Sequence, residues 1–97
     1  MAQPNRIRRV QWTERFQKAY KGLSQELQRE TDEAIRDLIK EHIPNSRRFA
    51  PLGGFRNPRV YVVHVTTNHS HKMSFEVDAD LAILRHVDTH KVIDKKP

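Results

Sequence analysis

Histidines and basic side chains are the residues of this chain whose types and spacing could support chemistry. The sequence holds six histidines and no cysteine, which excludes disulfides, thiolate zinc sites and cysteine nucleophiles. Two histidine pairs have the spacing of metal ligands: His69 with His71, and His86 with His90. Each spacing projects two imidazoles to one side of a strand or a helical turn. The first pair falls in a predicted turn and the second spans a predicted strand end, so a surface or hydrogen-bonded structural role is the default for each histidine.

His90 has the strongest case for a chemical role. It follows the last predicted strand, where the sheet edge meets solvent, and this position brings it close to the strand that carries Lys72. An imidazole titrates near pH 6.5, roughly, and beside phosphate-binding cations it is suited to the proton transfers of RNA cleavage.

The sequence is basic, but its charge is unevenly distributed. Lys and Arg number 18 against 12 Asp and Glu, which gives a formal charge of +6 and suits nucleic acid or an acidic protein partner. No acidic residue occurs from His42 to Phe75. This acid-free span holds Arg47, Arg48, Arg56, Arg59 and Lys72, together with His42, His64, His69 and His71. The span is either a loop made soluble by arginines or a phosphate-binding surface, because a guanidinium matches phosphate oxygens.

Length and composition favour one small domain that covers residues 1–97. The chain is 36% hydrophobic and 31% charged, so its core is lean and a partner that covers more surface would stabilise it. No apolar run approaches the roughly 20 residues of a membrane span. Residues 1–5 have no apolar signal core behind them, and a cytoplasmic location is the expectation.

Two amphipathic helices are predicted in the first half of the chain. Thr13 suits the N-cap of a short helix that stops near Gly22, and Ser24 suits the N-cap of a second helix that ends before Pro44. The inward faces of the two helices are Phe16, Ala19, Tyr20 and Leu23, then Leu27, Thr31, Ala34, Ile35, Leu38 and Ile39. A short connection at 22–24 favours a helical hairpin.

Alternating and β-branched segments predict the strands. Strands are expected at residues 6–12, 59–66, 71–77 and 81–87, with a loop at 44–58 and a short helix or tail at 88–97. The order β-α-α-β-β-β predicts an α+β fold in which the helical hairpin packs on one face of a small antiparallel sheet. The alternation turns Met73, Phe75 and Val77 toward the helices. It leaves Lys72, Ser74 and Glu76 on an open face.

Four segments carry a family resemblance that extends over nearly the whole chain. Residues 10–16 (VQWTERF) look like an opening strand that runs into a first helix, and residues 44–52 (PNSRRFAPL) look like the loop after the helical hairpin. Residues 72–77 (KMSFEV) occupy the place of a strand that usually begins with arginine, and residues 81–90 end in histidine as one branch does. In these features the chain resembles the RelE/ParE superfamily of type II toxin–antitoxin toxins.

The resemblance implies an mRNA endoribonuclease, ribosome-dependent or free, that inhibits translation, needs no cofactor and pairs with a cognate antitoxin. Metal-free cleavage by the 2′-OH needs a base, an acid and cations that hold the extra negative charge. His90 is the candidate acid or base. Lys72 and Arg59 are candidates for phosphate stabilisation. Arg47, Arg48, Arg56 and His71 are candidates for RNA binding, and Glu76 is either a second proton-transfer group or a solvated carboxylate.

Two departures from the family pattern and two other functions stay in view. Lys72 keeps the charge of the usual arginine without its fork, and no Tyr or Phe follows His90, where active relatives often carry an aromatic that stacks on a base. The chain could instead be a non-nucleolytic module for antitoxin pairing or gyrase inhibition, as the ParE branch implies. A metal-dependent regulator built on the histidine pairs is the third function considered.

Overall fold

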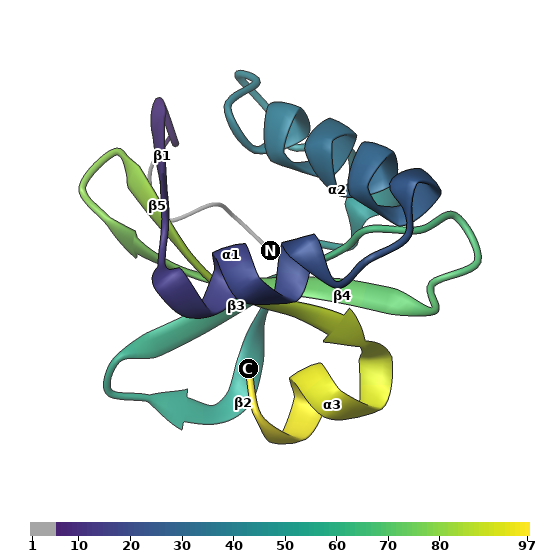
Figure 1. The fold of residues 1–97 in the computed structure, drawn as a ribbon. Coiled ribbons are helices and arrows are strands. Elements are labelled where there is room, and N and C mark those ends of the chain that lie inside the picture. Colours follow the sequence, from purple (N-terminus) through teal and green to yellow (C-terminus); the bar gives the residue numbers. More distant parts are fainter. Residues whose placement is uncertain (1–5) are drawn as a thin grey trace.

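One five-stranded sheet organises the part of the chain that the computed structural model describes, residues 6–97. Its strands are β1 (Arg9–Trp12), β2 (Ala50–Arg56), β3 (Arg59–His64), β4 (His71–Asp78) and β5 (Leu81–Thr89). They lie in the order β1-β5-β4-β3-β2, so β5, β4 and β3 occupy the interior of the sheet (Figure 1). The expectation for residues 1–5 falls outside the described residues.

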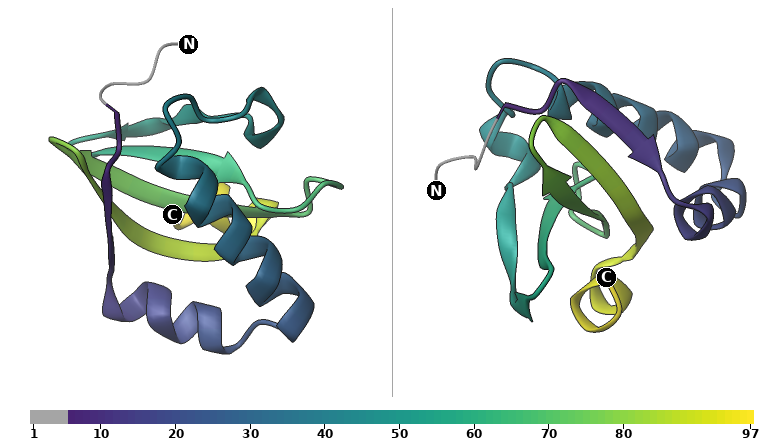
Figure 2. Two further views of the ribbon diagram at one scale, coloured as in Figure 1. Left: turned by 90° about the horizontal axis from the view of Figure 1, so that it is seen from above. Right: turned by 90° about the vertical axis from the view of Figure 1, so that its left-hand side faces the viewer.

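Helices α1 (Glu14–Lys21) and α2 (Gln25–Leu38) form the predicted hairpin. Both predicted N-caps are confirmed: the Thr13 hydroxyl accepts from the Phe16 amide at 3.1 Å, and the Ser24 hydroxyl accepts from the Leu27 amide at 3.2 Å. These bonds satisfy amide donors that the first helical turn leaves unpaired. The hairpin covers one face of the sheet (Figure 2).

The main core lies between this hairpin and the sheet. Phe16, Ala34 and Leu38 from the helices are fully buried against Met73 and Phe75 of β4. The predicted orientation of β4 is therefore confirmed, as are the α+β class and the helical hairpin.

The sheet differs from the expected one in two respects. Residues 50–56, predicted as loop, form β2, a strand that pairs with β3 at the sheet edge. Pro51 and the two glycines, Gly53 and Gly54, read as loop signals, but an edge strand tolerates them because one of its sides needs no partner. In addition, β1 pairs with β5 in parallel, so the sheet is mixed rather than wholly antiparallel.

A third helix, α3 (His90–Lys95), covers part of the face that was predicted to be open. It lies on the side of the sheet opposite the hairpin (Figures 1 and 2) and buries Ile93 completely. The prediction that Lys72 and Ser74 lie on an open face is wrong: only 7% of Lys72 and none of Ser74 is exposed. The sequence permits either a short helix or a tail at 88–97, so it does not predict that a helix covers this face.

No helix in residues 6–97 has the length and apolar character needed to cross a lipid bilayer.

Candidate active site

Three histidines gather where β3 ends and α3 begins. The rings of His64 and His69 have centroids 4.7 Å apart, and those of His64 and His90 lie 5.8 Å apart. The Nδ1 atoms of His64 and His69 are 2.9 Å apart, which is a hydrogen bond in which one ring donates and the other accepts. We call His64, His69 and His90 the histidine cluster.

A tight turn between β3 and β4 brings His69 into the cluster. The Thr66 hydroxyl accepts from the Ser70 amide at 2.9 Å, and the His69 amide donates to the Thr66 carbonyl at 3.1 Å. His69 itself has φ 60°, in the left-handed region that side chains rarely adopt. The turn therefore holds His69 in an unfavourable backbone conformation that folds its ring back onto His64. Strain of this kind is concentrated at functional sites.

Asp94 of α3 links two of the predicted catalytic residues. Its Oδ1 atom accepts from Lys72 Nζ at 2.8 Å, and its Oδ2 atom lies 2.9 Å from His90 Nδ1. His90 and Asp94 are one helical turn apart, so the helix itself fixes their contact. With Nδ1 held by the carboxylate, Nε2 is the His90 nitrogen that can reach a substrate. The side chain of His90 is 46% exposed, whereas the side chain of Lys72 is only 9% exposed.

The electrostatics of the cluster are read most clearly at His64. Burial, followed by the positive charges of Lys72, His69, Arg48 and His90, lowers the pKa of His64 from 6.5 to about 4. His64 is therefore neutral at pH 7. The Arg48 guanidinium and the Lys72 ammonium beside this ring also contribute a positive potential, which suits a phosphate.

Arg47, which was predicted to bind RNA, is held by hydrogen bonds to α2 and to the end of β3. Its Nε donates to Asp37 of α2 at 2.8 Å, and its Nη1 donates to the carbonyls of Val65 at 2.9 Å and His64 at 3.3 Å. Only 16% of its side chain is exposed. Arg47 fastens the end of β3 to α2 and so positions His64.

Arg48 lies beside the cluster in a cleft of about 430 Å³. The cleft is lined by Ser46, Arg47, Arg48, Thr66, Thr67 and His69. Arg48 is exposed and, like His69, has a positive φ, of 51°. Among residues 6–97 only Arg48, His69 and Ala79 combine a side chain with positive φ, and two of the three line this cleft.

Of the other predicted site residues, Arg56, Arg59 and Glu76 lie away from the cluster, whereas His71 pairs in the sheet with Thr89, the residue before His90. Arg56 and Arg59 pair across the β2–β3 hairpin, at the opposite end of β3 from His64. Glu76 is held by Arg85 Nη1 at 2.6 Å, and His71 Nδ1 lies 2.8 Å from the Ser70 hydroxyl. The structure thus brings His90 and Lys72 together and separates Arg59 and Glu76 from them.

The arrangement offers proton transfer and anion binding. Two partly exposed imidazoles, His69 and His90, flank a neutral buried one, and Arg48 stands at the rim. In the described residues, no group of three or more His, Cys, Asp or Glu side chains is arranged to hold a metal ion.

Two solved structures resemble this chain over most of its length. A chain of the RelB–RelE antitoxin–toxin complex from Methanococcus jannaschii matches 91% of this chain and 100% of its own, with a TM-score of 0.68 and 21% identity. A copper-bound mutant toxin from Helicobacter pylori matches 88% of this chain and 97% of its own, with a TM-score of 0.61 and 19% identity. The chain has the fold of RelE-like toxins. No protein-family model and no curated protein sequence matches it.

On this RelE-like fold, sequence reasoning missed His64, His69 and Asp94 as members of the site. The His90 and Asp94 spacing of four residues was a usable signal for a helical pair, provided that 90–95 was taken as helix. His64 and His69 carried no such signal, because only the turn at Thr66 to Ser70 brings their rings together.

Proposed function

We propose that this chain is the toxin of a type II toxin–antitoxin system and that it cleaves mRNA at the histidine cluster without a metal ion. The supporting observation is the joining of Asp94, His90 and Lys72 beside two further histidines. Together they supply a held imidazole, a second imidazole and positive charge, which are the groups that cleavage by the 2′-OH requires. The RelE-like fold adds weight to the toxin assignment.

His90 and His69 are the two proton-transfer groups of this mechanism. One takes the proton from the attacking 2′-OH, and the other protonates the leaving 5′ oxygen, so the phosphodiester is converted to a 2′,3′-cyclic phosphate and a free 5′-OH. Asp94 orients His90 by accepting a hydrogen bond from Nδ1, as a carboxylate orients histidine in other acid–base sites. His64 forms one hydrogen bond with His69, as donor or acceptor, and this bond keeps the His69 ring in place.

The cations around the cleft stabilise the negative charge that develops on the phosphate. Arg48 is exposed and can meet the phosphate directly in the cleft that it lines together with Thr67. Lys72 is buried and its ammonium is paired with Asp94, so it acts on the phosphate through its charge and not by direct contact. Arg56 and Arg59 contribute to backbone binding at a distance from the bond that is cut.

A cognate antitoxin is the second partner of the proposed toxin. The solved neighbour is a toxin seen together with its antitoxin, and the acid-free span of this chain offers a basic surface that an acidic segment would cover. A bound antitoxin would raise the melting temperature by mass action, because it binds the folded state only.

The test is to produce the protein alone in a bacterium and to map growth and mRNA ends. The wild type should arrest growth and create new 5′ ends in mRNA. His90→Ala should lower the cleavage rate by about 10²–10⁴-fold, the usual contribution of a general acid or base. The matched control is His42→Ala, which removes an exposed imidazole that lies in none of the cluster contacts.

The same assay separates the remaining functions. Arrested growth with intact mRNA would refute the nuclease and leave a binding module such as a gyrase inhibitor. Cleavage by purified protein should survive EDTA, and its loss on chelation with recovery on added metal would refute the metal-free mechanism. Equal cleavage by wild type and His90→Ala would remove His90 from the mechanism.

A further inference from the structure

A second pocket lies at the far end of the sheet from the histidine cluster. It has a volume of about 410 Å³, within the range of small-ligand sites. Its lining comes from the β2–β3 hairpin and one residue of β5: Gly54, Phe55, Arg56, Asn57, Pro58, Val60 and Arg85. We call it the hairpin pocket. No residue of it belongs to the histidine cluster.

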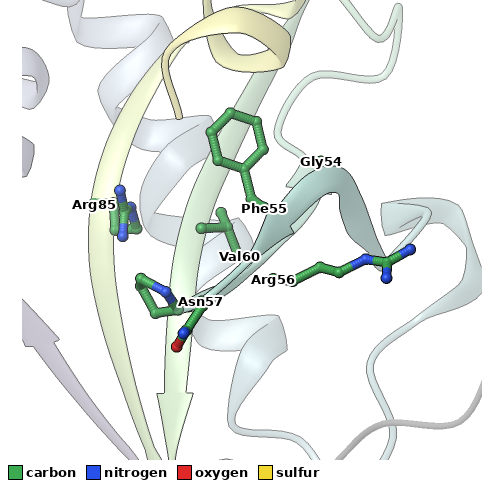
Figure 3. Close-up of a pocket in the computed structure, with 7 residues that line it drawn as sticks. Gly54, Phe55, Arg56, Asn57, Val60 and Arg85 are labelled. Atoms are coloured by element: carbon green, nitrogen blue, oxygen red, sulfur yellow. The ribbon is translucent and has the colours of Figure 1, made fainter.

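The side chains around the hairpin pocket differ in direction (Figure 3). Phe55 and Val60 face the space between the hairpin and β5, and Arg85 borders the same space from β5. Asn57 stands at the tip of the hairpin, whereas the guanidinium of Arg56 points away from the others. The pocket is therefore formed by an aromatic ring, an aliphatic floor, an amide and one guanidinium.

Arg85 is held in place rather than free to move. Its Nη1 atom donates to Glu76 Oε2 at 2.6 Å, and the two side chains are 27% and 31% exposed. A guanidinium fixed on one edge by a carboxylate still presents its flat face, which stacks on aromatic systems. Glu76, a residue away from the cluster, acquires in this way a role in shaping the hairpin pocket.

We propose that the hairpin pocket binds one base of the single-stranded RNA whose backbone is cut at the histidine cluster. This proposal rests on the proposed function. A nucleobase is flat, stacks on aromatic rings and guanidinium planes, and carries edges that an amide can bond. Phe55 and Arg85 offer stacking surfaces and Val60 the floor, and Asn57 lines the pocket at the tip of the β2–β3 hairpin.

The position of the pocket relative to the cluster supports the same occupant. Val60 and His64 lie four residues apart on β3, so their side chains project from one face of the sheet about 13 Å apart. A few nucleotides of extended RNA span that distance. Phe55 would thus provide the aromatic contact that is missing after His90, from a different part of the chain.

The experiment measures binding of short single-stranded RNA oligonucleotides to His90→Ala protein, which holds RNA without cutting it. In a series of oligonucleotides, one base at a time is replaced by an abasic nucleotide. One position should weaken binding by about 5- to 150-fold, the cost of losing one stacked base. Phe55→Leu, which keeps apolar volume in the hairpin, should weaken binding of the intact RNA similarly and abolish the penalty at that position.

Three further measurements make the result decisive. Phe55→Trp keeps a stacking face and should bind RNA at least as well as Phe55, and melting curves establish that each variant is folded. Arg56→Ala should lower the salt dependence of binding without changing the abasic profile, because its side chain points out of the pocket.

The outcomes separate this proposal from the proposed function. Cleavage by wild type with an unchanged abasic profile in Phe55→Leu would overturn the base-binding role alone. Normal RNA binding by Phe55→Leu with weaker pairing to a co-purified antitoxin would assign the pocket to a protein contact instead. A wild type that neither binds nor cuts RNA would overturn both.

Discussion

The two faces of the sheet are built from different chemistry. On the face that the helical hairpin α1–α2 covers, β4 contributes Met73 and Phe75, which are fully buried among helical side chains. On the α3 face, the same strand contributes Lys72 and Ser74, which are almost as deeply buried. The first face is packed mainly with apolar groups, whereas the second, beside apolar residues such as Ile93, encloses a charge that needs Asp94 as its partner.

This difference separates stability from chemistry within a very small protein. Burial of apolar surface is the main source of folding free energy, and it is concentrated beneath the hairpin. The charges and imidazoles of the other face cost free energy to bury and are retained only where hydrogen bonds hold them. Residues such as Arg47 connect the two faces. Arg47 bonds both to Asp37 of α2 and to the backbone at the end of β3.

The largest expected effect breaks the apolar face. Phe75→Ala should destabilise the fold by about 3–5 kcal/mol, because it removes a fully buried ring that stacks near Tyr61 and Phe49. The neighbouring Ser74→Ala should cost within about 1 kcal/mol, since the Ser74 hydroxyl makes only a long 3.4 Å bond to the His86 carbonyl. Urea unfolding of both variants measures the contrast, and equal losses would refute the division between the faces.

A second effect is specific to the α3 face and depends on pH. The folded state holds the pKa of His64 at about 4, below its ordinary 6.5. Between these values the unfolded chain takes up a proton that the folded chain refuses, so stability is fully present above pH 6.5 and falls as the pH drops toward 4. The loss is about 3 kcal/mol.

His64→Asn isolates this contribution, because its amide can replace the Nδ1 bond but does not titrate in that range. The unfolding free energy of His64→Asn should change less between pH 6.5 and pH 4 than that of the wild type. Burial also lowers the pKa of His86, so a shallower dependence of the same sign should persist. Identical pH profiles for the two proteins would show that His64 is not the buried neutral base described above.

The contrast between the faces also explains what the sequence could predict. Apolar periodicity and capping residues report burial against the hairpin, so the helices, their caps and the orientation of β4 were predicted. Lys72 violates the rule that charged side chains face water, and only the cover by α3 and the partner Asp94 make its burial possible. β2 was not predicted, because Pro51 and the glycines indicate a loop, whereas an edge strand can accommodate them.

The site was predicted only in part, for a related reason. His90 and Lys72 could be placed together from strand order alone. The contribution of His69 depends on a turn with positive φ, and the role of Arg47 depends on Asp37, ten residues away on a helix end. Contacts of this kind are set by tertiary structure and leave no local pattern in the sequence.

A third prediction sharpens the role of the charged pair at the site. Asp94→Asn preserves the shape of the side chain but weakens the bonds to His90 and Lys72. A hydrogen bond to a charged group contributes about 1.5–3 kcal/mol, so cleavage should slow by about 10- to 150-fold. The pH–rate profile should shift as well, whereas a merely structural role would lower the rate at every pH equally. Asp94→Glu, which restores the charge, should recover part of the rate.

The smallest expected effect concerns the exposed cation beside the cleft. If Arg48 meets one phosphate, Arg48→Ala should reduce the slope of log affinity against log salt by about 0.7 for single-stranded RNA, since one counterion fewer is released. Arg29→Ala removes the same charge from an exposed position on α2, in the hairpin, and should leave that slope unchanged. Fluorescence anisotropy titrations over a series of salt concentrations measure both slopes. Equal slope changes for the two arginines would mean that RNA senses only the net charge of the protein, and the distinction between the two faces would then not extend to RNA binding.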